Sequence, residues 1–342
     1  MTTTTQPWAV GRTLVRDVTE PLLTVRDLEV EYRTRRGVVR AVDHVSFDVY
    51  PNEVLGLAGE SGCGKSTIAH AVTRILKPPA YITGGKIMLG GVDVLAMNEE
   101  NLRGFRWEHL AIVFQSAMNA LNPVITIGEQ IVDAIQAHMN VTRREARQRA
   151  LELLETVGID PKRIDSYPHQ LSGGMRQRAV IAIALALNPE LIIMDEPTTA
   201  LDVVVQKQII EEIQQLKRQF GFSIIFITHD LSLLVEMSDR IAIMYAGEIV
   251  EIAPSRQLFE SPQHPYTQRL MNSFPSISGA RQTLKGIPGA PPDLSDPPPG
   301  CRFHPRCDVA IAGRCQEVHP ALREVKPGHW AACHLLDQEV SQ

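Results

Sequence analysis

The chain lacks an apolar run long enough to cross a membrane. Its longest such run, residues 179–187, has nine residues, whereas a membrane-spanning helix needs roughly 20. A buried core helix therefore accounts for it better. Residues 1–20 are rich in threonine and interrupted by charge, without the apolar core of a signal peptide, and we interpret them as a flexible tail. We expect a cytosolic chain that reaches a membrane only through partners.

An excess of basic charge is also missing. The 342 residues include 34 Lys and Arg against 39 Asp and Glu, which gives a formal net charge of −5. Proteins that bind nucleic acid usually carry a basic excess, so we expect no nucleic-acid partner. The chain has no sustained heptads and no internal repeat. With 44% hydrophobic and 21% charged residues, it has the composition of a globular protein with two or three domains.

Strands and helices are expected to alternate along most of the chain, which predicts a doubly wound α/β core with a mostly parallel sheet. Hydrophobic periodicity distinguishes the two kinds of element. The expected strands are 22–32, 45–49, 54–58, 111–114, 191–194, 222–228 and 240–245, and the expected helices are 66–76, 127–139, 143–157, 173–187 and 203–220. Residues from about 96 to 185 are expected to form an inserted helical subdomain. Residues 288–300 contain six prolines and predict an extended linker.

A glycine-rich segment between a predicted strand and a predicted helix, residues 59–66, has the form G-x-x-x-x-G-K-S. Such loops surround phosphate oxygens with backbone N–H groups, place a Lys on the terminal phosphates and offer a hydroxyl to Mg²⁺. A glycine-rich structural turn is the alternative, and the thiol in the loop is expected only to pack. The residues expected to contact nucleotide or its metal are Gly59, Ser61, Gly62, Cys63, Gly64, Lys65, Ser66 and Thr67, with Lys65 on the β- and γ-phosphates and Ser66 on Mg²⁺.

Polar side chains at the ends of other predicted strands complete a candidate hydrolytic site. Asp195 is expected to hold Mg²⁺, because ligands bind at the carboxyl ends of parallel strands. Glu196 can orient or deprotonate the attacking water, and His229 can sense the γ-phosphate. Gln115 can ligate Mg²⁺ or water, and Tyr32 can stack on adenine. The alternatives are a solvated turn for the two carboxylates, a structural role for His229 and a packed strand aromatic for Tyr32; the position of Gln115 is by itself a weak signal.

A second anion-binding segment begins at Ser172, far in sequence from the glycine-rich loop. Ser172 is a good N-cap, and Gly173 and Gly174 leave backbone N–H groups bare at the positive end of the helix dipole. A helix start of this kind binds anions.

Taken together, these segments resemble the ATP-binding cassette (ABC) family over residues 22 to about 255. The family's motifs occur in its order: Walker A at 59–66, the Q-loop Gln115, the signature at 171–177, Walker B at 191–195 with Glu196, the D-loop at 200–202 with Asp202, and the switch His229. The resemblance implies a P-loop NTPase (RecA-like) core, N-terminal antiparallel strands, ATP and Mg²⁺ as ligands, and ATP hydrolysis. It also implies a head-to-tail dimer with a paralogous or identical subunit, in which each ATP lies between one chain's loop and the other chain's signature helix.

Three further segments resemble the ATPases of oligopeptide and dipeptide importers: 114–123, 264–267 (His-Pro-Tyr-Thr) and 300–307 (Gly-Cys-Arg-Phe-His-Pro-Arg-Cys). This resemblance implies a subunit bound at the cytoplasmic face of the cell membrane to two permease subunits, with an extracytoplasmic binding protein that delivers peptide. Nickel and glutathione importers share these features, so import of another small solute is an alternative. A soluble cassette ATPase outside transport is a third, less favoured by a single cassette and acidic charge.

Four of the five cysteines come after residue 300, at Cys301, Cys307, Cys315 and Cys333, with gaps of five, seven and seventeen residues. In a reducing cytosol they are more plausible as metal ligands than as disulfides. A proline-rich segment of little apolar content also needs a staple to fold. Resemblance to the importer ATPases implies a [4Fe–4S] cluster; Zn²⁺ and reduced thiols are the alternatives, with His329 and His334 as other ligands. The expected domains are a tail (1–20), a cassette (21–255) and an extension with the four-cysteine site (256–342).

Overall fold

The computed structural model describes residues 19–341 apart from 36, 116–119, 200 and 274–285. Most of the expected N-terminal tail, part of the importer-like segment 114–123 and one residue of the D-loop therefore lie outside the described residues. The chain divides into two compact units, one of Met1–Leu23, Asp48–Glu53 and Met88–Phe226 and the other of Thr24–Phe47, Val54–Ile87 and Ile227–Gln342. We describe each by itself.

The first unit contains a sheet in the order β8-β7-β6. β6 (Leu110–Val113) and β7 (Leu191–Asp195) run parallel, with Leu110 opposite Leu191, and β8 spans Ser223–Ile227. Every residue of β7 and β8 is buried, which explains why their sequences are apolar throughout rather than alternating. A two-residue strand, β5 (Val92–Asp93), pairs antiparallel with the end of β4 (Ala80–Leu89).

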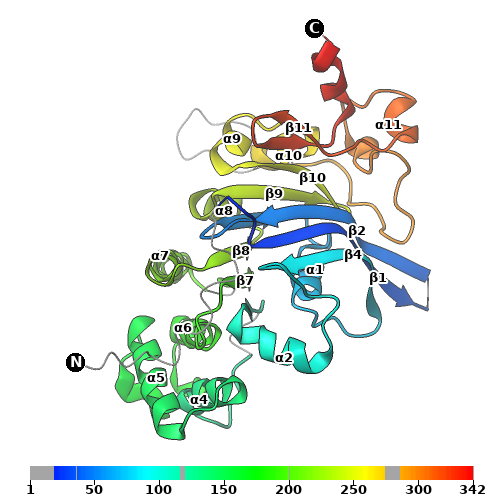
Figure 1. Ribbon diagram of the computed structural model, residues 1–342. Helices are drawn as coiled ribbons and strands as arrows, with labels where there is room; N and C mark the ends of the chain where they lie inside the picture. Colours follow the sequence, from blue (N-terminus) through cyan, green and yellow to red (C-terminus); the bar gives the residue numbers. More distant parts are fainter. Residues whose placement is uncertain (1–18, 36, 116–119, 200, 274–285, 342) are drawn as a thin grey trace. The chain divides into compact units, whose positions relative to one another are not determined.

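The helices of the first unit are α2 (Glu99–Glu108), α4 (Ile127–His138), α5 (Arg143–Thr156), α6 (Gly173–Ala184) and α7 (Val203–Phe220), with 3₁₀ turns at Pro161–Asp165 and Pro168–Gln170. Figure 1 shows α4, α5 and α6 side by side, and these three pack on one another. Thr142 starts α5 with a capping box whose partner is Glu145. α7 buries one apolar stripe and ends at Gly221 in the left-handed conformation that favours glycine.

Two predicted helices end earlier than their apolar patterns suggest. The helix expected to reach residue 76 is α1 (Lys65–Val72); the Thr73 hydroxyl donates to the Ala69 carbonyl, and Arg74 turns the chain with a φ of 50°. α6 ends at Ala184 rather than at 187 because residues 185–187 form a turn before Asn188, whose φ is 54°. The residues after α6 are still apolar and buried, and Ile75 and Leu76 after α1 are apolar and half-buried, so the apolar pattern alone did not mark either end.

The second unit contains a mixed sheet in the order β11-β12-β10-β9-β3. β3 (Val54–Ala58) runs parallel to β9 (Arg240–Tyr245). β10 (Glu248–Pro254) then pairs antiparallel with β9 on one side and with β12 (His329–Ala331) on the other, and β11 (Arg323–Lys326) pairs antiparallel with β12. Two strands from the far end of the chain therefore extend this sheet by antiparallel pairing.

A smaller sheet of the second unit has the order β2-β1-β4, with β1 at Leu23–Thr34 and β2 at Gly37–Val49. The predicted strand 45–49 covers only the end of β2, because His44, with a φ of 50°, interrupts the alternation on which the prediction depended. The short helices of this unit are α8 (Leu231–Met237), α9 (Ser255–Glu260), α10 (Pro265–Asn272) and α11 (Arg314–Glu317), with 3₁₀ turns at His304–Arg306 and His334–Ser341.

Residues after 255 share a core with the strands before them. The Phe303 ring packs on Tyr245 and Tyr266, with ring centroids 5.2 and 5.4 Å away. The fully buried carboxylate of Glu251 on β10 accepts hydrogen bonds from the backbone N–H of His264 at 2.9 Å and pairs with Nε2 of His329 at 2.6 Å. The cysteine-rich segment was expected to have too few apolar residues for a core of its own. Its Phe303 instead packs into a core formed with Tyr245 of β9 and Tyr266 of α10.

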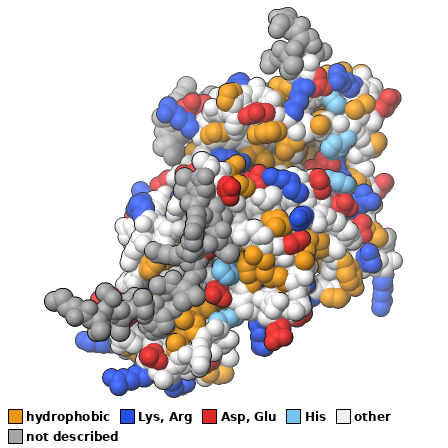
Figure 2. Space-filling model, viewed as in Figure 1, with side chains coloured by type: hydrophobic (Ala, Val, Ile, Leu, Met, Phe, Trp, Pro, Cys, Tyr) orange, Lys and Arg blue, Asp and Glu red, His pale blue; other side chains and the backbone are white. Residues whose placement is uncertain are grey.

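No helix among the described residues is both long enough and apolar enough to span a bilayer. On the face drawn in Figure 2, Lys and Arg side chains are interspersed with Asp and Glu.

Candidate functional site

The glycine-rich loop of the second unit connects β3 to α1 and is fitted closely to its surroundings. A Cβ atom at Gly59 would lie 2.2 Å from the Met244 carbonyl oxygen, and one at Gly64 would lie 2.2 Å from that of Ala41. Both glycines also have a positive φ, of 149° and 110°. No other residue fits these two positions, because the backbone packs against them and their conformation strains an L side chain.

Lys65 already lies over this loop. Its side-chain Nζ donates to the carbonyls of Gly59 at 2.8 Å and Glu60 at 3.1 Å and lies 3.6 Å from Cys63 Sγ, and the residue is 7% exposed. The Cys63 thiol is buried, as expected of a packing residue; burial raises its pKa, although Lys65 opposes the rise. The loop therefore holds a fixed cation where a phosphate group would enter.

Two other predicted nucleotide ligands lie beside the loop. The hydroxyls of Tyr32 on β1 and Thr67 on α1 are 3.3 Å apart, so the structure brings the expected adenine-stacking residue next to an expected phosphate ligand. Ser66 is half-buried at the start of α1. His229, two residues after β8, is exposed, and Asp230 next to it caps α8.

The loop also has partners that sequence reasoning did not assign. The Glu60 backbone N–H donates to Tyr266 Oη at 3.0 Å, and the Arg306 guanidinium holds both Glu60 carboxylate oxygens at 2.7 and 3.0 Å. Both partners come from the segments that resemble importer ATPases, 264–267 and 300–307. The resemblance singled out these segments but gave no role to Tyr266 or Arg306.

In the first unit, Gln115 and Glu196 are in direct contact. Gln115 Nε2 donates to Glu196 Oε2 at 2.7 Å, and the hydroxyl of Thr199, which sequence reasoning did not consider, donates to the same oxygen at 3.0 Å. Glu196 has a φ of 49°, and left-handed non-glycine residues often mark functional sites. Asp195 is the buried last residue of β7. The two carboxylates therefore lie in different environments: that of Asp195 is buried, and that of Glu196 is half-buried.

The N-terminus of α6 is built as expected. The Ser172 hydroxyl accepts a hydrogen bond from the Met175 backbone N–H at 3.3 Å, and a Cβ atom at Gly174 would lie 2.8 Å from Val205 Cγ1 on α7. Asp202, the predicted D-loop residue, caps α7 and accepts hydrogen bonds from the N–H groups of Val204 and Val205. α6 and α7 thus pack closely at their N-terminal ends.

The four late cysteines converge on one pocket of the second unit. Burial raises the pKa of Cys301 to about 12 and that of Cys333 to about 11, and neighbouring thiols add to both shifts. The backbone N–H of Ile311 lies 3.3 Å from Cys315 Sγ and can donate to it. Both ring nitrogens of His334 are engaged, by Asp337 and the Val318 carbonyl, and His329 pairs with Glu251. The cysteines are therefore better placed as ligands than the two histidines.

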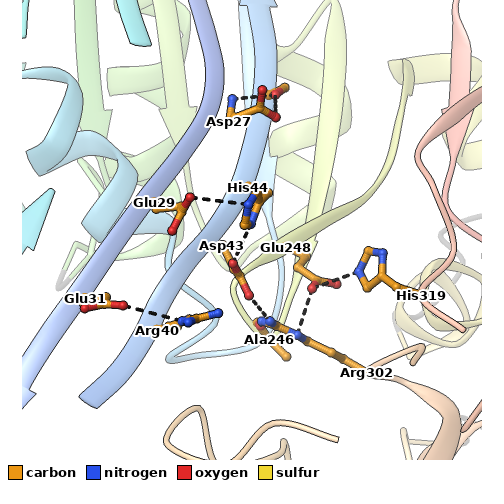
Figure 3. Close-up of polar contacts among 11 residues, drawn as sticks. Asp27, Glu29, Glu31, Arg40, Asp43, His44, Ala246, Glu248, Arg302 and His319 are labelled. Atoms are coloured by element: carbon orange, nitrogen blue, oxygen red, sulfur yellow. Dashed lines mark hydrogen bonds and ion pairs between the residues drawn. The ribbon is translucent and has the colours of Figure 1, made fainter. Parts of the chain in front are cut away.

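Among the described residues, Glu29, Asp43 and His44 are the one group of three metal-ligating side chains whose ligand atoms lie within 4.8 Å of one another. Figure 3 shows them on β1 and β2, with Asp43 turned toward Arg302. Burial raises the pKa of Asp43, but its hydrogen bond with His44 and the charge of Arg302 outweigh burial and lower it. A cation here would face a guanidinium, so the group is an ion-pair network.

Comparisons with known proteins cover nearly the whole chain. The family profile described as "ABC transporter" matches residues 42–199, and that described as "Oligopeptide/dipeptide transporter, C-terminal region" matches 250–315. A probable peptide ABC transporter ATP-binding protein of Sinorhizobium fredii is 49% identical over 324 residues, 94% of this chain and 96% of that protein. The dipeptide transport ATP-binding protein DppD of Bacillus subtilis is 42% identical over the same shares of the two chains.

Solved structures agree. The ATP-binding cassette MJ0796, in a dimeric post-hydrolysis state bound to ADP and Pi, has a TM-score of 0.61 and 27% identity, over 68% of this chain and 99% of that one. The cbiO1 protein of Clostridium perfringens, part of the ABC transporter complex cbiONQ, has a TM-score of 0.61 and 25% identity, over 71% of this chain and 92% of that one.

Proposed function

This chain belongs to the ABC transporter family, as one of its ATP-hydrolysing subunits, and on that premise we propose that it drives the import of di- or oligopeptides. The observation that carries the proposal is the similarity to peptide and dipeptide import ATPases along 94% of the chain, including the C-terminal region at 250–315. Import of nickel, glutathione or another small solute is the alternative.

We propose that the loop at 59–66 binds the phosphates of ATP, with Lys65 on the β- and γ-phosphates and Tyr32 against adenine. Ser66, Asp195 and Gln115 would hold Mg²⁺, which neutralises charge on the transferred phosphoryl group. Glu196 orients the attacking water, takes its proton and delivers the hydroxide oxygen to the γ-phosphorus, so that ADP leaves. The contact of Gln115 with Glu196 supports this assignment, because it places the proposed base beside a proposed metal ligand. His229 would sense the γ-phosphate.

We propose that Ser172, Gly173 and Gly174, together with Asp202, complete the ATP site of a second cassette subunit. The exposed helix start supports this role, since its N–H groups and dipole favour a phosphate. That second subunit is a paralogue or another copy of this chain. ATP would close the pair and hydrolysis would reopen it, which moves two permease subunits at the cytoplasmic face of the membrane. An extracytoplasmic binding protein would deliver the peptide.

The test is reconstitution with the permeases that co-purify with the chain, in vesicles, with peptide-loaded binding protein. Glu196→Gln should keep ATP binding, abolish turnover and trap a closed pair. Glu211→Gln, on the exposed face of α7, is the control and should bind ATP, turn it over and reopen like the wild type. Peptide should stimulate the ATPase activity. Stimulation by nickel or glutathione but not by peptide would instead establish the alternative substrate class, and co-purification with nucleic acid rather than permeases would contradict a transport role.

We also propose that Cys301, Cys307, Cys315 and Cys333 hold a [4Fe–4S] cluster, with Zn²⁺ and reduced thiols as alternatives. Four Zn–S bonds of about 2.3 Å would bring the sulfurs within about 3.8 Å of one another, yet no three of these sulfurs lie within 4.8 Å of one another. A cluster that binds each cysteine through a different iron suits the wider spacing better. The raised pKa values favour a metal too, because a cationic centre stabilises buried thiolates.

Anaerobic purification, followed by iron and acid-labile sulfide assays and a visible spectrum, tests the cluster. Cys315→Ser should remove most of the iron and the visible absorbance. Cys63→Ser changes a cysteine outside the four and should leave both in place. Colourless protein that contains zinc and no iron would overturn the assignment.

A further inference from the structure

Two residues of the C-terminal segment hydrogen-bond to Glu60 of the phosphate loop. Tyr266 accepts the Glu60 backbone N–H through its hydroxyl, and Arg306 binds the Glu60 carboxylate with two hydrogen bonds. We call these three residues the Glu60 clamp. Glu60 is the second residue of the loop and Arg306 lies 246 positions further along the chain, so the clamp links the loop to a remote segment.

The charge of Glu60 makes this contact important. A carboxylate within an anion-binding loop repels the phosphates that the loop must hold, and this Coulomb repulsion is stronger where water is partly excluded. The Glu60 side chain is 23% exposed and that of Arg306 only 7%, so bulk solvent screens the pair incompletely. Arg306 supplies the opposite charge in the bidentate geometry that guanidinium and carboxylate groups favour.

Arg306 is itself fixed by other contacts. Its Nε donates to the Pro288 carbonyl at 2.7 Å and its Nη2 to that of Gly289 at 3.2 Å, both at the start of the proline-rich linker. The ring of Tyr266, itself part of the clamp, packs with the rings of Tyr245 and Phe303. The guanidinium therefore holds one orientation toward the loop.

A second arginine of the same segment, Arg302, is linked to the loop through ion pairs and backbone hydrogen bonds, and Figure 3 shows the ion pairs. It pairs with Asp43 on β2 and with Glu248 on β10. The Asp43 N–H donates to the Gly247 carbonyl at 2.9 Å, and the Gly247 N–H donates to the carbonyl of Cys63 in the loop at 3.0 Å. The segment that carries the cysteines thus reaches the loop by two routes, of which only the Glu60 clamp acts on its charge.

We propose that Arg306 and Tyr266 are positioning residues for ATP binding: Arg306 neutralises Glu60 and turns its carboxylate away from the phosphates, and Tyr266 fixes the backbone at the start of the loop. The inference rests on the proposed binding of ATP by residues 59–66. It gives the C-terminal region a direct part in nucleotide affinity, in addition to any part in holding a cluster.

The test measures ATP affinity by calorimetry and the KM for ATP and kcat of hydrolysis in purified full-length chain. Arg306→Gln should raise the Kd and KM for ATP roughly tenfold and change kcat much less, because the clamp acts on binding. The Kd of Arg306→Lys should lie between those of the wild type and of Arg306→Gln, since lysine keeps the charge but loses the bidentate geometry. Tyr266→Phe should raise the Kd by a smaller factor. Arg256→Gln, which breaks an exposed ion pair with Glu260 on α9, is the matched control and should change nothing.

The deciding variant is the double substitution Glu60→Gln with Arg306→Gln. If Arg306 acts by neutralising Glu60, the double variant recovers most of the affinity that Arg306→Gln loses. If Arg306 only holds the C-terminal segment in place, removing the Glu60 charge restores nothing, and that result would overturn the proposal, as would an unchanged Kd in Arg306→Gln. Melting temperature and iron content identify variants that misfold. Two other results would refute ATP binding by the loop instead: a wild-type chain that does not bind ATP, or a Lys65→Ala variant that binds ATP as tightly as the wild type.

Discussion

The loop at 59–66 and the N-terminus of α6 are the two segments that we propose to bind phosphate, but they are built differently. The loop has no room for a Cβ atom at Gly59 or Gly64, carries its own cation in Lys65 and is held by a distant segment through Glu60. The start of α6 relies on one capping hydroxyl and the helix dipole. On the proposed function, we therefore expect the loop to bind phosphate alone, and α6 only to add to phosphates that another subunit already holds.

Removing the cation of the loop should have the largest effect. Lys65→Ala deletes a buried ammonium group that is already oriented by the Gly59 and Glu60 carbonyls. Charge-assisted hydrogen bonds contribute about 1.5–3 kcal/mol each, so we expect the Kd for ATP to rise at least about 100-fold. Calorimetry on the isolated chain measures this.

Lys86→Ala removes an exposed lysine of β4 in the same unit and serves as the control, with no expected change in Kd. If Lys65→Ala weakened binding no more than Lys86→Ala, the loop would not depend on its own cation. The contrast with α6 would then disappear.

Crowding the start of α6 should affect turnover more than binding. Gly174→Ala puts a methyl group 2.8 Å from Val205 Cγ1, so either the Val205 side chain or the start of α6 must shift. We expect ATP binding by the isolated chain to stay unchanged and turnover to fall roughly tenfold, equivalent to about 1.4 kcal/mol in the barrier. Steady-state hydrolysis by the assembled transporter measures the turnover.

Adding Val205→Ala to Gly174→Ala removes the crowded methyl group and should restore turnover. Failure of this rescue would show that the backbone of the glycine, and not the packing of α6 on α7, sets the requirement. A change in ATP affinity of the isolated chain would contradict the division of labour between the two segments.

Local chemistry made much of the nucleotide machinery predictable. The strand 54–58 and the helix 203–220 have the predicted bounds. Each depends on a local pattern: an apolar run for the strand, and an amphipathic stretch ended by Gly221 for the helix. Ser172 was expected to cap α6 for the same reason, and it does. Signals that lie within a few positions of one another can be read without the fold.

The contacts that sequence reasoning missed join residues far apart in the chain. No local pattern pairs Arg306 with Glu60, or β10 with β12, since only the folded sheet brings them together. Asp202 shows the converse: its place in a motif predicted a nucleotide ligand, while its carboxylate caps α7. Motif position predicts which residues matter but leaves open which atoms are already engaged.

The smallest expected effect concerns the capping hydroxyl of α6. Ser172→Ala removes the acceptor for the Met175 N–H, which should cost about 1 kcal/mol and lower the melting temperature by about 2 °C. Ser172→Asn, which can still cap, should retain most of that stability. Turnover should fall only a few-fold in Ser172→Ala, because the N–H groups of Gly173 and Gly174 remain. A loss of turnover as complete as that of Glu196→Gln, without a matching loss of stability, would mean that the hydroxyl itself binds phosphate and that α6, like the loop, depends on a side chain.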